Sequence, residues 1–314
     1  MILLATNKRD ITTDFIVLEL QRRGLDFVRL NTEDLSSATV EFDPANGWLY
    51  TMAERQFALN EVTAGYYRRP EPPQAPGAIT DRASADYCVA EWSAVLRSLW
   101  NALDGRWLNS PFAILRAEDK PRQLAYARAV GLDVPDTLVT NDFAAAEAFV
   151  ARGPAIGKPL RQSLIDDGDT GQVLFTSRIG ELSPEDRDAV ALAPVILQSE
   201  LSKQCDIRAT VVGEQVFAAA IHSQDQDETQ TDWRRGTDPD LVHEIINLPA
   251  PQMARLVALT KRLGLRFGAV DLVLDRDGRY WFLELNPNGQ WAWIERRTGL
   301  PIAAAIVDAL EARG

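Results

Sequence analysis

The sequence is poor in the side chains that most often serve as catalytic nucleophiles, general bases or zinc ligands. Its 314 residues include two cysteines, Cys88 and Cys205, and two histidines, His222 and His243. The cysteines have no metal-binding spacing and are too few for a disulfide framework, which favours a reducing, cytoplasmic location. A mechanism built on a Cys–His or Ser–His pair is therefore not expected.

Long apolar runs and glycine-rich phosphate loops are also missing. No segment is long enough to span a bilayer, and MILLATNKRDITTDF at the start does not have the pattern of a signal peptide. Neither GxxxxGK[ST] nor a strand-linked GxGxxG occurs, so any phosphate must be held by single lysines, a loop or a metal. The net charge of −12 argues against nucleic acid and anionic membranes as main partners.

The hydrophobic pattern predicts a fold of mixed class. Strands at residues 1–6 and 25–31 flank a helix that ends before Gly24, and this β-α-β unit favours a parallel sheet. Short antiparallel strands are expected over 40–64 and a long amphipathic helix over 81–103. The first part is thus predicted to be α/β and the later part α+β.

The segment FGAVDLVLDRDGRYWFLELNPNGQWAW, residues 267–293, predicts a β-hairpin that turns at DRDG. A turn centred on Arg276 and Asp277 assigns the alternating side chains to two faces. The predicted core face carries Val270, Leu272, Leu274, Trp281, Leu283 and Leu285. The predicted opposite face carries Asp271, Val273, Tyr280, Phe282, Glu284 and Asn286.

Two carboxylates and one carboxamide thus fall on one face of the hairpin. Asp271 and Glu284 become diagonal cross-strand neighbours, and two negative charges that close repel unless a cation lies between them. Oxygen donors without His or Cys suit magnesium. A solvated polar face is the alternative, although it does not account for the NPNGQW turn that follows the strand.

The order of motifs resembles that of the ATP-grasp carboxylate–amine ligases. It runs from NSP and Lys120 through GKP, a glycine-containing loop, VILQSEL and DIRATVVG to DLVLD and FLELNPNGQW. The tail, together with YYRRP and DWR, resembles more specifically the microviridin-type peptide maturases, which make graspetides. The resemblance implies a pre-ATP-grasp α/β domain over 1–108, a central lobe over 109–196 and a C-terminal lobe over 197–314.

The same resemblance implies ATP and Mg²⁺ between the two lobes. Lys120 and Lys158 would reach the phosphates, and the loop over 161–171 would close on them. The adenine would meet the segment Gln198, Ser199, Glu200 and Leu201, and Asp206 would contact either a ribose hydroxyl or the substrate. Asp271, Glu284 and Asn286 would bind magnesium. Arg208 and Arg234 would stabilise the transferred phosphate or the tetrahedral intermediate. Gln290 and Trp291 would shape the substrate end, with a core position as the alternative for Trp291.

The reaction implied by the resemblance joins an Asp or Glu side chain of a ribosomally made precursor peptide to a Ser or Thr hydroxyl, or to a Lys amine. Arg68 and Arg69 match the subfamily pattern without an evident physical role. Relatives often dimerise, so a homodimer is one expectation. The nearest alternative is a ligase that adds amino acids to a protein or small acid. A non-catalytic nucleotide-binding module and an NAD or sugar-nucleotide enzyme are more distant alternatives.

Overall fold

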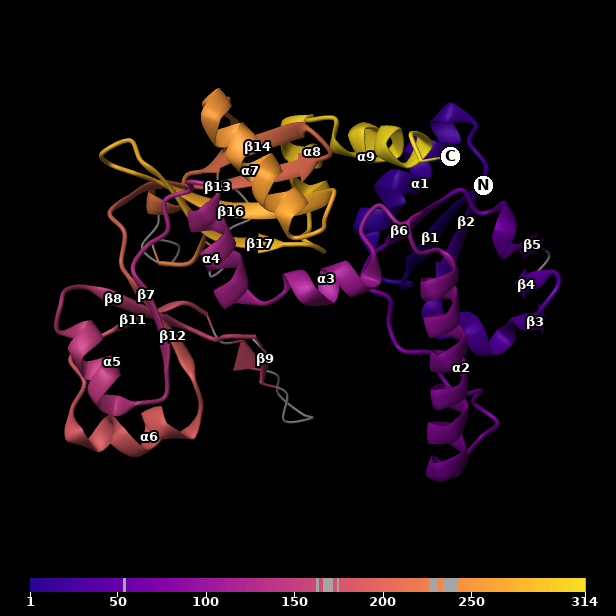
Figure 1. Cartoon of the computed structure of the whole chain (residues 1–314), viewed down its shortest axis with the longest axis horizontal. Coiled ribbons are helices and arrows are strands. Elements are labelled where there is room, and N and C mark those ends of the chain that lie inside the picture. Colours follow the sequence, from indigo (N-terminus) through magenta and orange to yellow (C-terminus); the bar gives the residue numbers. More distant parts are fainter. Residues whose placement is uncertain are drawn as a thin grey trace.

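A computed structural model describes residues 1–52, 55–161, 164–165, 172–173, 175–225, 231–233 and 242–313. Figure 1 shows a region that carries α1 and α2, a small lobe that carries α5 and α6, and a larger sheet region that carries α7. Helices and sheets are mixed in all three, which confirms the predicted α/β and α+β class.

The N-terminal region contains the predicted β-α-β unit. It comprises β1 (Ile2–Thr6), α1 (Ile11–Arg23) and β2 (Phe27–Asn31), and β6 (Ala64–Tyr67) lies on the other side of β1. Both pairings are parallel. Gly24 ends α1 with a φ of +67°, a backbone conformation that side chains with a Cβ avoid.

An antiparallel sheet of β3 (Thr39–Asp43), β4 (Gly47–Met52) and β5 (Arg55–Ala58) follows β2, as predicted. The helix α2 (Arg82–Ala102) and this sheet share a core with one side of the parallel sheet. On the other side of the parallel sheet, the C-terminal helix α9 (Ile302–Glu311) packs against α1. The two termini therefore lie close together (Figure 1).

The small lobe is built on an antiparallel sheet in the order β11-β8-β12-β7. Its strands are β7 (Thr137–Thr140), β8 (Ala155–Lys158), β11 (Ser177–Ile179) and β12 (Val195–Ser199), and its helices are α5 (Phe143–Val150) and α6 (Arg187–Leu192). Two short strands, β9 (Leu164–Ile165) and β10 (Gln172–Val173), pair with each other. Short 3-10 turns occur at Thr32–Ser37, Leu59–Glu61, Pro184–Asp186 and Ser223–Asp225.

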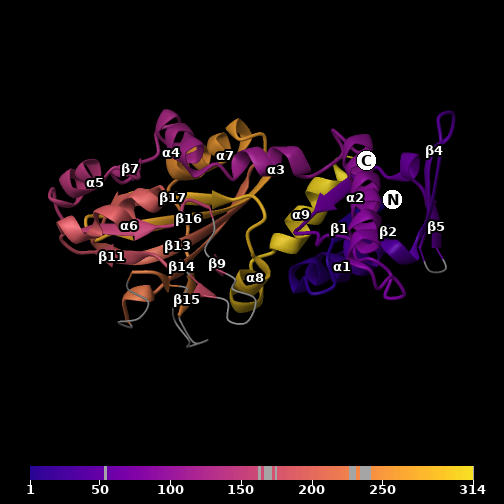
Figure 2. The same ribbon diagram turned by 90° about the horizontal axis from the view of Figure 1, so that it is seen from below.

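The larger sheet is antiparallel throughout, in the order β15-β14-β13-β16-β17. Its strands are β13 (Lys203–Val212), β14 (Gln215–Ile221), β15 (His243–Ile245), β16 (Phe267–Asp275) and β17 (Tyr280–Asn286). α3 (Pro111–Ala117), α4 (Lys120–Ala129) and α7 (Ala250–Arg262) contribute to the core on one face, and α8 (Ala292–Thr298) follows β17. Figure 2 shows α4 and α7 on the same side of this sheet.

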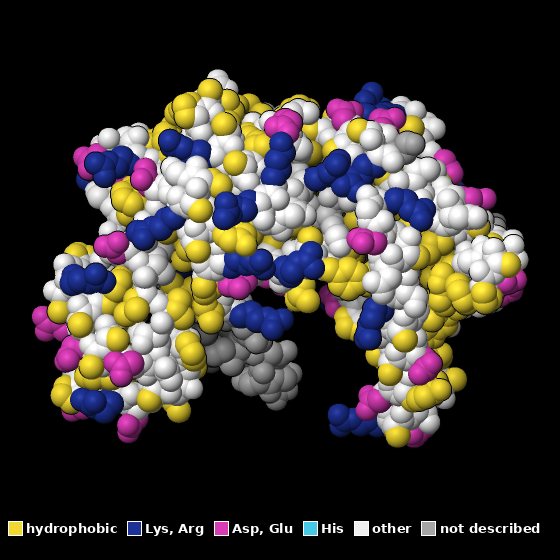
Figure 3. Space-filling model, viewed as in Figure 1, with side chains coloured by type: hydrophobic (Ala, Val, Ile, Leu, Met, Phe, Trp, Pro, Cys, Tyr) yellow, Lys and Arg dark blue, Asp and Glu magenta, His cyan; other side chains and the backbone are white. Residues whose placement is uncertain are grey.

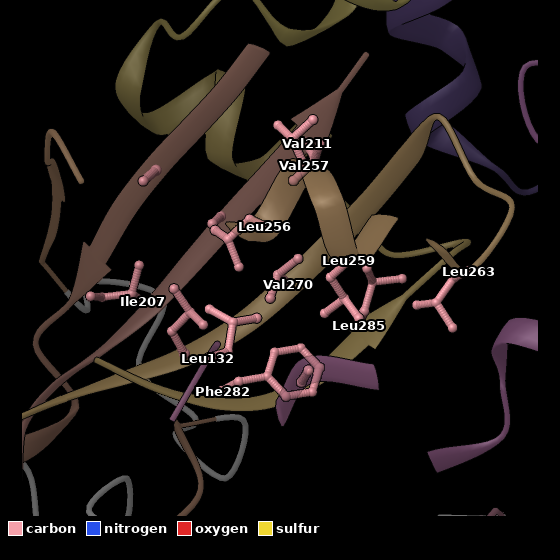
Figure 4. Packing of buried hydrophobic residues seen from close by; sticks show 14 of the residues in the cluster. Leu132, Ile207, Val211, Leu256, Val257, Leu259, Leu263, Val270, Phe282 and Leu285 are labelled. Carbon is pink, nitrogen blue, oxygen red and sulfur yellow. The ribbon is translucent and has the colours of Figure 1, made fainter. Parts of the chain in front are cut away.

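The core under α7 joins side chains from distant parts of the chain. Figure 4 shows Leu256 and Leu259 of α7, together with Leu263 directly after the helix, beside Val270 of β16 and Leu285 of β17. Leu132, which follows α4, lies in the same cluster, so part of the segment predicted as central lobe is packed on the larger sheet. The division at residues 108 and 196 stays a prediction. In the described part of the chain, no helix is both long and apolar enough to cross a membrane.

The hairpin register predicted from DRDG is wrong by one residue near the turn. Leu274 pairs with Tyr280, and a bulge beyond Leu272 places Asp271 directly opposite Glu284. Phe282 is consequently buried in the core, whereas Leu283 lines a cavity on the opposite face. The predicted alternation failed here because a three-residue turn and one bulge each shift the side-chain phase.

Candidate active site

A cavity of about 390 Å³ lies between the sheet of the small lobe and the larger sheet. Ten of the predicted site residues line it: Lys120, Lys158, Gln198, Ser199, Glu200, Leu201, Asp206, Asp271, Glu284 and Asn286. Figure 3 shows a hollow between the lobe of α5 and α6 and the region of α2, with Lys and Arg side chains along its upper edge. The two lobes therefore bring residues more than 160 positions apart to one place.

A row of charged side chains crosses three neighbouring strands. Asp271 and Glu284 line the cavity, whereas the predicted residue Arg208 is not among the described lining residues. Arg208 of β13 pairs with Asp271 of β16, which pairs with Glu284 of β17. Arg208 Nη1 lies 3.3 Å from Asp271 Oδ1, and Lys120 Nζ lies 3.5 Å from Glu284 Oε2. Arg208 and Lys120 thus supply part of the positive charge expected beside the two carboxylates. This positive charge lowers the repulsion between Asp271 and Glu284.

The three predicted metal ligands can face one centre. Asn286 is two residues after Glu284 on the same strand, so both side chains point to one side of the sheet. Asn286 Oδ1 accepts a hydrogen bond from the backbone N–H of Asn288 at 2.9 Å, which fixes the amide. The described residues contain no group of three or more His, Cys, Asp or Glu side chains that could together hold a metal ion. Two carboxylates and one carboxamide still fit Mg²⁺, because this ion commonly takes its remaining ligands from phosphates and water.

Two lysines enter the cavity from opposite lobes. α4 starts at Lys120 because Asp119 caps the helix by accepting from the N–H of Arg122. Lys120 Nζ also donates to the carbonyl of Pro159 at 3.2 Å. Lys158, at the end of β8, donates to Gln198 Oε1 at 3.1 Å. These contacts hold both ammonium groups at the wall of the cavity.

Gln198 is tied to the small lobe on both sides of its amide. Its Nε2 donates to Thr137 Oγ1 at 2.9 Å, while its Oε1 receives the bond from Lys158. The side chain is almost fully buried. Its carboxamide therefore positions the Lys158 ammonium group.

The connection between the two lobes runs along the cavity at Ser199, Glu200 and Leu201. The amides of Ser199 and Glu200 donate to the carbonyls of Asp136 and Pro154, both at 2.9 Å. The carboxylate of Glu200 forms an ion pair of 2.7 Å with Arg178 on β11. These contacts use the amides of Ser199 and Glu200 and turn the Glu200 side chain toward the small lobe.

Asp206 lies in a buried network at another wall of the cavity. Its Oδ1 is 3.0 Å from Lys203 Nζ, and its Oδ2 accepts from the hydroxyl of Ser223. Burial raises the pKa of Asp206, and the neighbouring ammonium and hydroxyl act in the opposite direction. Lys203 also lines the cavity but was missed, because the pattern around SKQCD gives no sign of which residue faces inward.

Two further residues missed from the sequence brace the end of β17. Gln123 of α4 accepts from the N–H of Leu285 at 2.8 Å and donates to its carbonyl at 2.7 Å. Asn109 donates to the carbonyls of Phe267 and Pro287 and accepts from the N–H of Phe267. Asn109 belongs to the quoted NSP motif, whereas Gln123 has no signal in the sequence. Both side chains hold the strand ends that carry the acidic residues.

Arg68 gives the YYRRP motif a physical role. Its side chain is 1% exposed, forms an ion pair of 3.0 Å with Asp10, and donates from Nη1 to the carbonyls of Asn288 and Gly289, both at 2.9 Å. It therefore ties the N-terminal region to the turn that follows Asn286.

Other predicted residues lie elsewhere. Trp291 is fully buried and donates from Nε1 to Tyr66 Oη at 3.3 Å, so its position is in the core and not at the cavity. Gln290 is exposed and does not line the cavity. Arg234 lies outside the described residues, as does most of the loop over 161–171.

Gly289 permits the close approach between the turn and β16. A Cβ atom at this position would lie 2.3 Å from Cβ of Ala269 and 3.2 Å from the carbonyl oxygen of Asn286. We expect Gly289→Ala to lower the free energy of unfolding by about 1–3 kcal/mol, because the core must shift to admit the methyl group. Urea denaturation checks this, and Gly77→Ala is the matched control since Gly77 has open space around its Cα. Equal stability of the two variants would contradict the expectation.

Comparison with known proteins places this geometry in a family. Residues 117–310, more than half of the chain, match the model of the RimK-like ATP-grasp domain. The chain therefore belongs to the RimK-like ATP-grasp family, and it is an ATP-grasp ligase. Ligases of this class use ATP, and the cavity between the two lobes is where the described lysines and acidic residues converge.

Three individual relatives show two kinds of named activity. The macrocyclase MdnC from Microcystis aeruginosa MRC, solved with the precursor peptide MdnA, is 28% identical over the whole of both chains, with a TM-score of 0.85. The ATP-grasp ligase PsnB, solved with a phosphomimetic precursor variant, Mg and ADP, is 26% identical over 99% of this chain and 98% of its own, with a TM-score of 0.77. A probable alpha-L-glutamate ligase of Histophilus somni is 28% identical over 208 residues, 65% of this chain and 67% of the relative.

Proposed function

We propose that this protein is an ATP-dependent peptide macrocyclase that joins side chains within a ribosomally made precursor peptide. The observation that carries the proposal is the similarity to the macrocyclase MdnC, which extends over the full length of both chains. The glutamate-ligase match covers 65% of this chain. The proposal includes a cytoplasmic location, where ATP and the precursor peptide are both present.

The proposed reaction has two displacement steps. An oxygen of an Asp or Glu side chain attacks the γ-phosphorus of ATP, the bond to the β-phosphate oxygen breaks, and ADP leaves. The product is an acyl phosphate. A Ser or Thr hydroxyl then attacks the acyl carbon, loses its proton, and displaces inorganic phosphate to leave an ester. A Lys amine in the same position gives an amide. No enzyme nucleophile is required, in agreement with the scarcity of Cys and His.

Lys120, Lys158 and Arg208 have separate proposed roles in these two steps. The ammonium groups of Lys120 and Lys158 bind phosphate oxygens from opposite lobes. Arg208 stands behind Asp271, and its buried Nε has no hydrogen-bond partner in the described part of the chain. An unpaired buried donor of this kind suits an anionic group that is present only during the reaction. The site thus favours negative charge where the phosphoryl group is transferred.

The acidic row is proposed to hold the metal. Asp271, Glu284 and Asn286 would bind Mg²⁺, which when present neutralises charge on the β- and γ-phosphates. Lys120 and Arg208 contact these carboxylates in the structure, so they orient both groups and offset part of their negative charge.

The base of the nucleotide is proposed to lie on the connection between the lobes. Since the amides of Ser199 and Glu200 are already used, the carbonyl of Glu200 and the amide of Leu201 remain to meet the base edge. Asp206 is a ribose or substrate contact in this proposal, within reach of the cavity beside Lys203.

Replacement of Arg208 is expected to change the rate of linking far more than the affinity for nucleotide. We expect Arg208→Ala to lower the rate of linking by about 100- to 1,000-fold, the loss typical of one preorganised donor to a developing anion. The dissociation constant of Mg·ADP should change far less, because the guanidinium acts on the transferred group. Single-turnover kinetics and calorimetric titration measure the two quantities. A parallel collapse of nucleotide affinity would make Arg208 a ground-state binder instead.

A second candidate function is the addition of amino acids to a protein or small acid. The 28% identity to the probable alpha-L-glutamate ligase supports it, and the residues around the phosphates would be the same in both activities. The two functions differ in the acceptor alone, so they are separated by product mass.

The test uses the whole protein with ATP, Mg²⁺ and, as candidate precursor, any short acidic, Ser/Thr-rich peptide that is encoded beside its gene. Loss of one water, about 18 Da, for each equivalent of ADP formed is the expected result, since each link condenses a carboxyl with a hydroxyl or amine. Gain of mass only when a free amino acid is supplied would overturn the macrocyclase proposal in favour of the second candidate.

A further inference from the structure

Arg69, the second arginine of YYRRP, has a strained backbone. Its φ is +43°, and it is the one non-glycine residue with a positive φ in the described part of the chain. The left-handed region brings Cβ against the backbone, so an arginine stays there only when its surroundings force it to. Such strain in a bulky residue is most often retained where a side chain must point in one direction.

Three contacts hold Arg69 in this conformation. Its carbonyl accepts from Asn7 Nδ2 at 2.6 Å, and the preceding N–H, of Arg68, donates to the carbonyl of Ala5 at 2.9 Å. Its Nε donates to the carbonyl of Asn288 at 3.2 Å, the same carbonyl that Arg68 binds. The guanidinium is therefore anchored through Nε, while Nη1 and Nη2 form no hydrogen bond or ion pair with the described residues.

The charge around Arg69 is unusual for so acidic a chain. Arg68 and Arg208 are near enough for their positive charges to oppose that of Arg69, and Asp10 and Glu118 act with the opposite sign. Asp10 is already paired with Arg68. Within the described residues, no carboxylate lies at ion-pair distance from Arg69, although the protein has a net charge of −12. An exposed arginine whose charge is opposed by Arg68 and Arg208 is a site that favours a bound anion.

The position of Arg69 separates it from the nucleotide. All described residues that line the cavity come from position 118 onward, whereas Arg69 belongs to the N-terminal region. Its partner Asn288 follows Asn286 by two residues, on the turn beyond the acidic row. Arg69 thus lies beside the turn that follows the acidic row, near the end of the site proposed for the metal and for phosphoryl transfer.

We propose that Arg69 binds the substrate carboxylate that is to be phosphorylated, through its Nη1 and Nη2 groups. This inference rests on the proposed function. A planar guanidinium fork matches a planar carboxylate with two parallel hydrogen bonds, whereas a lysine offers a single point charge. Arg208 acts on the transferred group from the sheet side, and Arg69 orients the attacking oxygen from the N-terminal side. Arg69 thereby selects a peptide whose side chain at this position is Asp or Glu.

Three variants test this role with the whole protein, ATP, Mg²⁺ and the candidate precursor peptide. In Arg69→Lys the charge is kept and the fork is lost, and in Arg69→Gln both are lost. Arg69→Gly accepts the positive φ without strain, so it separates the guanidinium from the backbone. Arg82→Gln, on the exposed face of α2, is the matched control. The readouts are the KM for peptide from ADP formation and the dissociation constant of Mg·ADP.

We expect all three variants to raise the KM for the peptide by about 10- to 100-fold, with Mg·ADP affinity within about twofold of the wild type. Full rescue by Arg69→Lys, or an unchanged KM in Arg69→Gly, would overturn the proposal. A tenfold loss of Mg·ADP affinity would overturn it too, because Arg69 would then bind phosphate. If the wild-type enzyme forms ADP with the peptide but the peptide loses no water, the proposal that the protein links side chains is contradicted. The effect of Arg69 on the KM for the peptide can still be measured in that case. No carboxylate-dependent ADP formation, with the peptide or with free L-glutamate, contradicts both proposals.

Discussion

Glu284→Gln is expected to reduce ATP turnover by about 1,000-fold while the fold stays intact. The carboxamide has nearly the same shape as the carboxylate but carries no charge, so it weakens a proposed metal ligand and removes the partner of Lys120 at 3.5 Å. A loss of this size corresponds to about 4 kcal/mol of activation free energy. Glu284 is partly exposed at the cavity wall, so its replacement leaves the buried cores unchanged.

The measurement is ADP formation over a range of Mg²⁺ concentrations, together with thermal unfolding by circular dichroism. Glu41→Gln, on the exposed strand β3, is the matched control, because it makes the same chemical change far from the cavity. Turnover equal to that of the wild type would remove Glu284 from the metal site. A lower melting temperature in Glu284→Gln alone would assign the loss to folding.

Arg68→Met is expected to lower the free energy of unfolding by about 3–5 kcal/mol, because it leaves Asp10 as a buried charge without its partner. The carbonyls of Asn288 and Gly289 lose their donor in the same variant. The hydroxyls of Thr6 and Thr13 still donate to Asp10, but they carry no compensating charge. Urea denaturation followed by tryptophan fluorescence measures the change.

A double-mutant cycle distinguishes the ion pair from the loss of packing. Asp10→Asn combined with Arg68→Met removes both charges, so we expect the double variant to recover part of the stability lost in Arg68→Met. Strictly additive effects of the two substitutions would show that Arg68 stabilises the protein only through the carbonyls of the turn.

The acidic residues of the β16–β17 hairpin could be predicted from the local sequence pattern only in part. The polar residues in the β16–β17 hairpin were visible in the sequence, because Asp271 and Glu284 interrupt otherwise apolar strands. Their mutual proximity was predicted correctly, but the predicted register was wrong. A turn one residue longer than expected and a bulge beyond Leu272 make them direct partners and exchange the faces of Phe282 and Leu283.

The residues that support the site from outside the hairpin were the hardest to predict from the sequence. Gln123 and Arg68 reach the site or its supports from other elements, through contacts with residues 162 and 221 positions away, whereas Lys203 contacts Asp206 on its own strand. Gln123 and Lys203 stand in stretches that otherwise resemble ordinary helix or strand surface. Arg68 stood in a recognisable motif, yet its target is a pair of backbone carbonyls, which leave no trace in residue identity.

By itself the sequence determined the mixed α/β and α+β class, the β-α-β opening, and the ligase family, because these depend on hydrophobic period, turn residues and ordered motifs that act over short spans. Only the tertiary structure decided which side chains meet: Lys120 with Glu284 across two elements, Arg208 with Asp271, and Arg68 with the turn after Asn286. The physical reason is that register and lobe packing are set by the whole core. A one-residue shift in a strand moves every side chain to the other face, and no local propensity records it.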